Sequence, residues 1–333
     1  MRMDSSEGPL VSFCVKCCNQ ERYIGEALAG AFAQTYRPLE VIVSDDASSD
    51  KSWEIIEASV AAYRRTPNAA PVVLNRNGAN LGNLGNWLAI CSLAKGELLV
   101  KADGDDVSFP ERTAKIVEAW RADGSRAMVV SHAGALMGPR GQRMGPMWRV
   151  SATAPAGAVM AFHRRVGETF GGAEDLRIVD DELFALRARM LGPELVIPDR
   201  LVRYRLGTGV SNSLWRMREP MCRGRRDLVK AYRQARRDLE KVRNRMSSEA
   251  FADWQGRLDV AEARADAELM LFTGENFAVR REGYRRIGPV RALSVWQFFK
   301  CAYLLPRPLG DCLLFAYAVV RYVMRRLKGV LGR

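Results

Sequence analysis

Four short apolar runs alternate with three segments of helical periodicity in the first third of the chain. The apolar runs lie at 10–15, 39–43, 72–74 and 98–102. Apolar residues recur at the spacing of one helix face in the intervening segments 21–34, 53–63 and 87–94. Strands joined by helices in this way favour a mostly parallel sheet covered on both faces. The sequence therefore predicts an α/β fold.

The fourth apolar run ends in three carboxylates, Asp103, Asp105 and Asp106. Like charges this close repel each other and raise one another's pKa. A hard divalent cation such as Mg²⁺ or Mn²⁺ relieves the conflict, because it prefers oxygen ligands and usually takes one or two carboxylates together with substrate phosphates. The plain alternative is a solvated, Asp-rich turn at the end of a strand.

Polar residues follow each of the four predicted strands. They are Lys16 and Asn19, Asp45 and Asp46, Asn80 and Gly82, and the three acids after the fourth strand. Ligands of parallel sheets gather beyond the carboxyl ends of the strands. Because each group suits a nucleotide or a metal ion, the pattern predicts a binding site at this one edge.

The order and spacing of these motifs resemble glycosyltransferase family 2, which has the GT-A fold. The resemblance rests on 11–24, 33–36, 40–50, 80–82, 94–97 and the Asp103-Gly-Asp105-Asp106 run. It is close over 10–125 and looser to about 213. It implies a Rossmann-like GT-A domain over 1–214, and an enzyme that takes a sugar from a nucleotide-sugar donor with inversion at the anomeric carbon.

The resemblance also implies roles for single residues. Asp46 would hydrogen-bond the nucleotide base, with Lys16, Asn19 and Asn80 on the donor side. Asp103 and Asp105 would form the D-x-D motif of a Mg²⁺ or Mn²⁺ site, with Asp105 as the direct ligand of a metal that bridges the diphosphate. One departure is that Lys16 and Cys18 stand where the family has a small hydroxyl residue and an aromatic, so base stacking on that aromatic is missing.

Two later positions complete the predicted site. Three acids, Asp180, Asp181 and Glu182, open a helical segment, where acids are also favoured simply by the helix dipole. By resemblance Asp181 is the catalytic base, and its two neighbours are the alternatives. Arg205 lies in a stretch that resembles the one closing this fold, so it is expected to pair with the diphosphate. The family's His in that stretch is Gly207 here.

The composition changes after Trp215. Residues 215–279 predict a helical linker or hairpin, and 280–333 hold twelve Lys and Arg against two acids in a chain of net charge +13. The tail's longest apolar run, 312–320, is shorter than the ~20 residues that span a bilayer. Basic residues with aromatics on an apolar helix face predict a helix lying on an anionic membrane surface. A helix packed on the core is the alternative. Nucleic-acid binding is disfavoured, because the aromatics are not among the basic groups.

The remaining observations concern compartment. Seven Cys at scattered positions predict reduced thiols rather than a disulfide framework. The polar N-terminal segment 1–10 shows no signal-peptide pattern. Together these features predict a cytoplasmic protein, peripheral on the inner face of the cell membrane.

The sequence thus favours a metal-dependent glycosyltransferase that extends a glycan acceptor. A membrane-facing tail suggests that the acceptor is lipid-linked, as in surface-polysaccharide biosynthesis. A sugar-phosphate nucleotidyltransferase is one alternative, but the loop at 16–19 lacks the Gly-rich, basic composition of a phosphate loop. A non-catalytic membrane-associated scaffold of the same fold is the other.

Overall fold

The computed structural model describes residues 8–146, 157–205 and 218–273, and the isolated positions 278, 279, 282 and 286. The chain divides into two compact units. The first contains Met1–Gly141 and Gly145–Arg205, and the second contains Gln142–Met144 and Leu206–Arg333.

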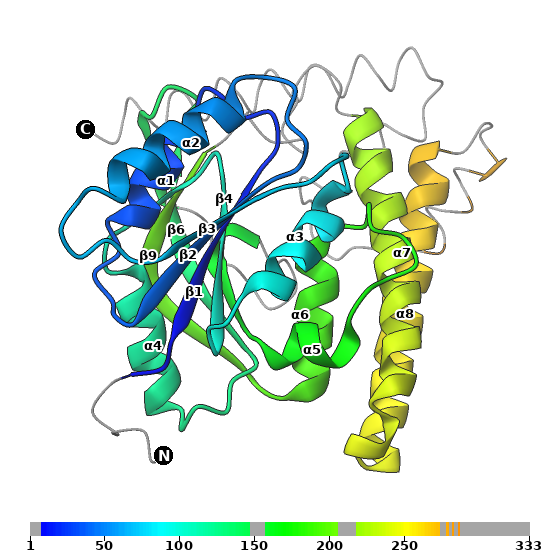
Figure 1. Ribbon diagram of the computed structural model, residues 1–333. Coiled ribbons are helices and arrows are strands. Elements are labelled where there is room, and N and C mark those ends of the chain that lie inside the picture. The colour runs from blue at the N-terminus through cyan, green and yellow to red at the C-terminus, as the bar shows by residue number, and fades with distance from the viewer. Residues whose placement is uncertain are drawn as a thin grey trace. The chain divides into compact units, whose positions relative to one another are not determined.

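The first unit alternates strands and helices as far as its fourth strand (Figure 1). This part consists of β1 (Val11–Cys17), α1 (Ile24–Phe32), β2 (Leu39–Asp45), α2 (Ser52–Tyr63), β3 (Val72–Arg76), α3 (Gly82–Leu93) and β4 (Leu98–Asp103). The later elements are β5 (Val107–Ser108), α4 (Arg112–Ala122), β6 (Val129–Met137), β7 (Arg143–Pro146), the short 3₁₀ helix η1 (Gly157–Val159), β8 (Met160–His163), α5 (Arg165–Phe170), α6 (Asp180–Leu191) and β9 (Glu194–Arg205).

The sheet has the strand order β3-β2-β1-β4-β8-β6-β9-β5. The predicted parallel arrangement is confirmed for β3, β2, β1 and β4. Beyond β4 the sheet is mixed, because β8 runs antiparallel to both β4 and β6 while β6 and β9 are parallel. The α/β class is therefore as expected, with an antiparallel strand inserted next to the acid-bearing β4.

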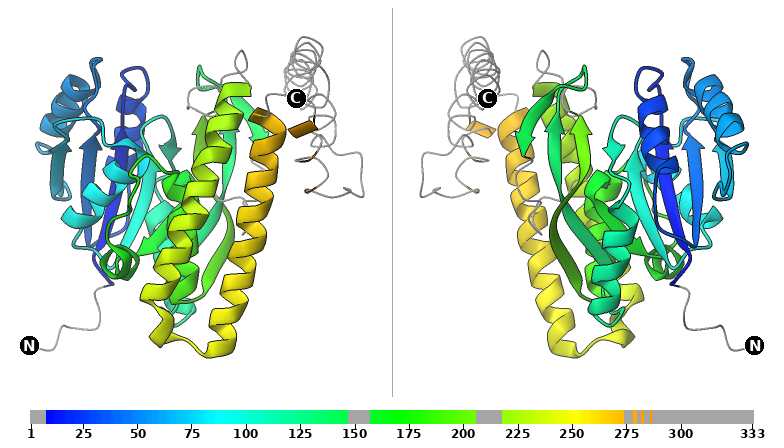
Figure 2. Two further views of the ribbon diagram at one scale, coloured as in Figure 1. Left: turned by 90° about the vertical axis from the view of Figure 1, so that its right-hand side faces the viewer. Right: turned by 90° about the vertical axis from the view of Figure 1, so that its left-hand side faces the viewer.

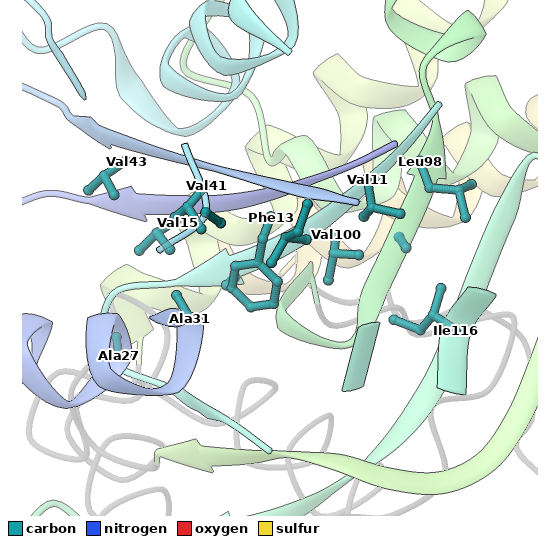
Figure 3. Close-up of a cluster of buried hydrophobic side chains, with 14 of the residues drawn as sticks. Val11, Phe13, Val15, Ala27, Ala31, Val41, Val43, Leu98, Val100 and Ile116 are labelled. Atoms are coloured by element: carbon teal, nitrogen blue, oxygen red, sulfur yellow. The ribbon is translucent and has the colours of Figure 1, made fainter. Parts of the chain in front are cut away.

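Side chains of successive residues along β1 and β4 point to opposite faces of the sheet. Val11, Phe13 and Val15 join Val100 in a buried cluster against α1, α2 and α4 (Figure 3). On the other face, an aromatic trio packs under α3 and α6, with ring centroids 5.6 to 6.1 Å apart; it consists of Trp87, Phe162 and Phe184. Both faces are thus covered by helices, which gives β1 and β4 buried positions on each side.

The second unit contains a hairpin of two long helices, α7 (Arg218–Lys241) and α8 (Ser248–Thr273), which run side by side (Figure 2). Buried Leu239 and Leu258 belong to its apolar seam. Ion pairs tie the two helices together, among them Arg225 with Glu268 at 2.7 Å and Arg233 with Glu262 at 2.9 Å.

None of the helices in the described part of the chain is long and apolar enough to cross a bilayer. The predicted membrane-associating tail at 280–333 lies outside the described residues, apart from Glu282 and Arg286.

Candidate functional site

The parallel register brings polar residues from neighbouring strands to one edge of the sheet. Lys16 of β1 is paired with Ser44 of β2 on one side and with Asp103 of β4 on the other. Cys17 is paired with Asp45. The carboxyl ends of these strands therefore meet, as the sequence pattern predicts.

Two lysines and three acids form a cluster at this edge. Lys101 and Asp103 are two residues apart on β4, so both point to the face that α6 covers. The first residues of α6 are Asp180 and Asp181. Lys16 Nζ lies 2.8 Å from Asp180 Oδ2, and Lys101 Nζ lies 3.1 Å from the same oxygen. Lys101 Nζ also donates a hydrogen bond to Asp181 Oδ1.

The same two ammonium groups face the D-x-D motif. Asp103 Oδ1 lies 3.6 Å from Lys16 Nζ and 3.7 Å from Lys101 Nζ. The side chain of Lys101 is 1% exposed and that of Asp180 is 3% exposed. Asp103, at 28%, and Asp181, at 22%, are the more accessible acids of the cluster. The cluster thus has a buried centre and two carboxylates that reach solvent.

Burial and charge act in opposite directions on these groups. Burial alone would raise the pKa of Asp180, but the charges of Lys101 and Lys16 outweigh it and lower the pKa to about 2. Burial raises the pKa of Asp181; Lys101 opposes this rise and the charge of Asp180 adds to it. Burial alone would lower the pKa of Lys101, but the surrounding acids raise it well above its ordinary value. Lys101 is therefore charged at neutral pH.

A backbone amide fixes the second oxygen of Asp181. Gly157 N donates a 2.8 Å hydrogen bond to Asp181 Oδ2. Gly157 opens η1, which leads directly into β8, the strand next to β4. A Cβ atom on Gly157 would overlap both Asp181 Oδ1 and Lys101 Nζ. The close approach of this backbone to the cluster therefore requires glycine.

Asp46 orders the loop that leads into α3. Its Oδ1 accepts hydrogen bonds from Leu81 N and Asn77 Nδ2, both at 2.8 Å, and its Oδ2 accepts one from Gly82 N at 2.9 Å. Asn80 Nδ2 lies 3.3 Å from Asp46 O and 3.2 Å from Cys18 Sγ. The structure thus brings Asp46 and Asn80 together, with both oxygens of the Asp46 side chain engaged by this loop.

Asn19 links the loop after β1 to the loop after β2. It adopts a positive φ of 52°, which Asn tolerates better than most residues. Its Oδ1 accepts a 2.9 Å hydrogen bond from Ser49 N, and its own amide donates a 2.8 Å bond to Ser48 Oγ. The exposed Asn19 therefore holds two of the predicted donor-side loops together.

Arg205 lies beneath the D-x-D motif. Its guanidinium donates to Asp105 O at 2.8 Å, Pro139 O at 3.1 Å and Glu26 Oε2 at 2.8 Å. Its backbone amide donates to Asp106 Oδ1 at 2.7 Å. Because the side chain is buried, these contacts indicate that Arg205 holds the backbone of the D-x-D motif in place.

Asp106 differs from its two neighbours. Among the described residues, its Oδ2 is buried and has no hydrogen-bond partner. Burial raises its pKa well above the ordinary value, and the charges of Asp105 and Asp103 add to the rise. Asp106 is buried, so the acids of this run that are able to face a cation are Asp103 and Asp105.

A metal at this edge would have few protein ligands. No group of three or more His, Cys, Asp or Glu able to hold a metal exists in the described ranges. Two carboxylates at one strand end still fit the sites of Mg²⁺ and Mn²⁺ that substrate phosphates complete. Asp103 suits such a site, because its carboxylate is partly exposed and lies 3.6 and 3.7 Å from the two lysines.

Lys101, Gly157 and Arg112 were not singled out by sequence reasoning. Lys101 carried a usable signal, since a lysine inside an otherwise apolar strand must find a buried acid. Arg112 is fully buried and donates to Lys101 O and Ala158 O, both at 2.8 Å. It joins β4 to η1 directly under the cluster, and burial lowers its pKa to about 9.

The sequence profile of the family Glycosyl transferase family 2 matches residues 12–172. A putative glycosyltransferase of Bacillus subtilis, EpsE, is 33% identical over 113 residues, which are 34% of this chain and 38% of that protein. The abequosyltransferase RfbV of Salmonella typhimurium is 35% identical over 99 residues, which are 29% of this chain and 28% of that protein. Each match spans well under half of the relative's length.

Solved structures show the same fold. The mannosyltransferase PcManGT from Pyrobaculum calidifontis, in complex with GDP-Man and Mn²⁺, superposes with a TM-score of 0.57 at 18% identity. The superposition covers 98% of this chain and 89% of that one. At this level of identity, the likeness concerns the fold.

Proposed function

Residues 12–172 form a glycosyltransferase family 2 domain, and from this premise we propose that the chain transfers a sugar from a nucleotide-sugar donor to a glycan acceptor. One observation carries the proposal: a single cluster joins Asp103, at the end of β4, to Asp181, at the start of α6. A donor-side acid and a candidate base thus both contact Lys101, as suits a direct transfer between two bound substrates.

Asp181 is the proposed catalytic base. It would take the proton from an acceptor hydroxyl as that oxygen attacks the anomeric carbon and the nucleoside diphosphate leaves. Its carboxylate is more exposed than that of Asp180, and burial raises its pKa, which strengthens it as a proton acceptor. Asp180 is held by two ammonium groups with a pKa of about 2, so it is the weaker base. Glu182 remains the alternative. A single displacement of this kind inverts the anomeric centre.

Asp103 and Asp105 are the proposed holders of Mg²⁺ or Mn²⁺. When bound, the cation would supply Lewis-acid neutralisation of the charge that develops on the leaving diphosphate. Arg205 supports this site through its 2.8 Å hydrogen bond to Asp105 O, rather than as an open phosphate ligand.

The donor's base would lie against the loops after β1, β2 and β3. Asp46 and Asn80 are the proposed donor-side residues, and Asn19 holds the two neighbouring loops in register. Because both oxygens of the Asp46 side chain already accept hydrogen bonds, a base would meet the loop that Asp46 orders or exchange with one of its bonds. Lys16 is assigned to the acid cluster at the ends of β1 and β4 rather than to the donor.

The acceptor is proposed to be a lipid-linked glycan at the inner face of the cell membrane. The support is the basic, aromatic composition of 280–333, which suits an anionic membrane surface. A relative named as an abequosyltransferase is consistent with the transfer of a sugar. Surface-polysaccharide biosynthesis is the setting that fits both features.

A ligand panel tests the proposal. The full chain is mixed with UDP-, GDP-, dTDP- and CMP-sugars, with and without Mn²⁺, and its melting temperature is recorded together with nucleotide release. One nucleotide class should raise the melting temperature in a concentration-dependent way, because a ligand that binds only the folded state stabilises it. The same class should be turned over in the presence of Mn²⁺. A chain that neither binds nor turns over any of the four classes contradicts the proposal.

A further inference from the structure

Lys16 and Lys101 each contact acids of two different elements. Lys16 Nζ lies 2.8 Å from Asp180 of α6 and 3.6 Å from Asp103 of β4. Lys101 Nζ lies 3.1 Å from Asp180 and 3.7 Å from Asp103. Each ammonium group therefore lies between the metal-side acid and the acids at the start of α6.

The burial of these two lysines indicates that their ammonium groups contact other groups of the protein rather than a ligand. The side chain of Lys101 is 1% exposed, and that of Lys16 is nearly as buried. A lysine that binds phosphate has to present its ammonium group to the ligand, whereas these two already donate to carboxylates of α6. A buried ion pair is maintained only when its charges satisfy one another, so Asp180 and the two lysines must remain together.

We propose that Lys16 and Lys101 are positioning residues that fix the start of α6, and with it Asp181, against the ends of β1 and β4. Asp180 is the anchor that both lysines grip, and Lys101 sets the direction of the Asp181 carboxylate together with Gly157 N. This inference rests on the proposed function for the role of Asp181, but the anchoring itself is a property of the folded chain.

Hydrogen–deuterium exchange of the full chain tests the anchoring without any substrate. Lys16→Met and Lys101→Met should speed exchange in 157–163 and 178–191 by about tenfold or more, because the contacts that hold these segments are removed. Exchange in 39–63 should stay as in the wild type. Lys115→Met is the matched control, since Lys115 is half-exposed on α4 and pairs only loosely with Glu118, at 3.8 Å.

Two further variants are measured in case Lys16→Met or Lys101→Met fails to fold. Lys16→Met combined with Asp180→Asn removes one buried cation and one buried carboxylate together, leaves Lys101 paired with Asp181, and should fold while exchanging faster in 178–191. Lys16→Arg keeps a cation and should restore exchange toward the wild-type rate. Wild-type exchange in both the single and the double variant overturns the proposal, and so does a rise of equal size in every segment.

Steady-state kinetics distinguish a role of Lys16 in positioning Asp181 from a role in binding the donor. With UDP-, GDP-, dTDP- and CMP-sugars as probes, Lys16→Met should lower the kcat for the donor that the wild type uses by about 100-fold, the order of loss expected for a misplaced reacting group. Its KM for the donor should change little. A raised donor KM with unchanged kcat would identify Lys16 as a donor ligand instead. If the wild type turns over none of the probes, the proposed function loses its support, while the exchange measurements still decide the anchoring.

Discussion

The backbone amide of Gly157 donates a 2.8 Å hydrogen bond to Asp181 Oδ2, across 24 residues of sequence. The other oxygen of the same carboxylate accepts from Lys101 Nζ. The direction of the Asp181 side chain is thus set from two sides, by β4 and by the turn that leads into β8. A catalytic base whose carboxylate is already oriented loses less conformational entropy when the acceptor hydroxyl binds.

Replacing Gly157 tests whether this residue orients the Asp181 carboxylate. In Gly157→Ala the new methyl group would overlap Asp181 and Lys101, so the carboxylate has to move. We expect turnover of the nucleotide-sugar found by the ligand panel to fall by about 100-fold, with the melting temperature less affected. Gly256→Ala is the control, because Gly256 is exposed on α8 and a Cβ atom there has no neighbour within 4 Å. Equal turnover in the two variants would show that Gly157 does not aim the base.

Replacing Asp180 and replacing Asp181 should lower the free energy of unfolding by different amounts. Asp180→Asn leaves Lys16 and Lys101 without the carboxylate that both grip, and breaking a buried pair in this way costs about 3 kcal/mol. Asp181→Asn removes a more exposed partner and should cost clearly less. Urea unfolding followed by circular dichroism measures both. A larger loss for Asp181→Asn would contradict the assignment of Asp180 as the anchor.

The depressed pKa of Asp180 predicts a pH dependence. The group titrates at about 2 in the folded chain and at 3.8 in its ordinary state, so the unfolded chain binds more protons in this window. Asp180 therefore stabilises the fold fully above about pH 4, by about 2 kcal/mol, and this contribution is lost as the pH falls toward about 2.

The measurement is the difference in free energy of unfolding between wild type and Asp180→Asn as a function of pH. The difference should narrow as the pH is lowered from about 5 to about 2.5, since the protonated acid no longer attracts the lysines. A difference that stays constant over this range would mean that Asp180 is not held ionised by Lys16 and Lys101.

Asp46 should matter for the donor-side loop. Asp46→Ala removes three hydrogen bonds to 77–82 and leaves the partly buried amides of Leu81 and Gly82 without this acceptor, which costs about 1 kcal/mol or more. Nucleotide affinity, measured by calorimetry with the nucleotide that the panel identifies, should fall as well. The exposed Asp199 on β9 offers the control, Asp199→Ala. Wild-type stability and affinity in Asp46→Ala would remove Asp46 from the site.

Much of this architecture could be predicted from local sequence. The spacing of apolar runs gave the strands up to β4, and the parallel register of β1 and β4 then brings Lys16 beside Asp103. The proximity of Asp46 and Asn80 follows from the same rule, since both lie in loops at the carboxyl ends of parallel strands.

The partners of the buried charges could not be predicted in this way. Lys101 and Asp181 are 80 residues apart, and their contact depends on where α6 docks on the sheet. Arg205 turns toward Asp105 O and Glu26 because β9 runs beneath the D-x-D motif, which no local pattern encodes. The antiparallel direction of β8 could likewise not be predicted, because a buried strand reads the same in either direction.

The most direct test of the account is the turnover of Asp181→Asn in the presence of Mn²⁺ and the nucleotide-sugar found by the panel, with Asp199→Asn as the surface control. The account predicts that Asp181→Asn binds the donor as the wild type does but turns it over at least about 100-fold more slowly, which is the range expected for loss of a general base. Wild-type turnover by Asp181→Asn would contradict it.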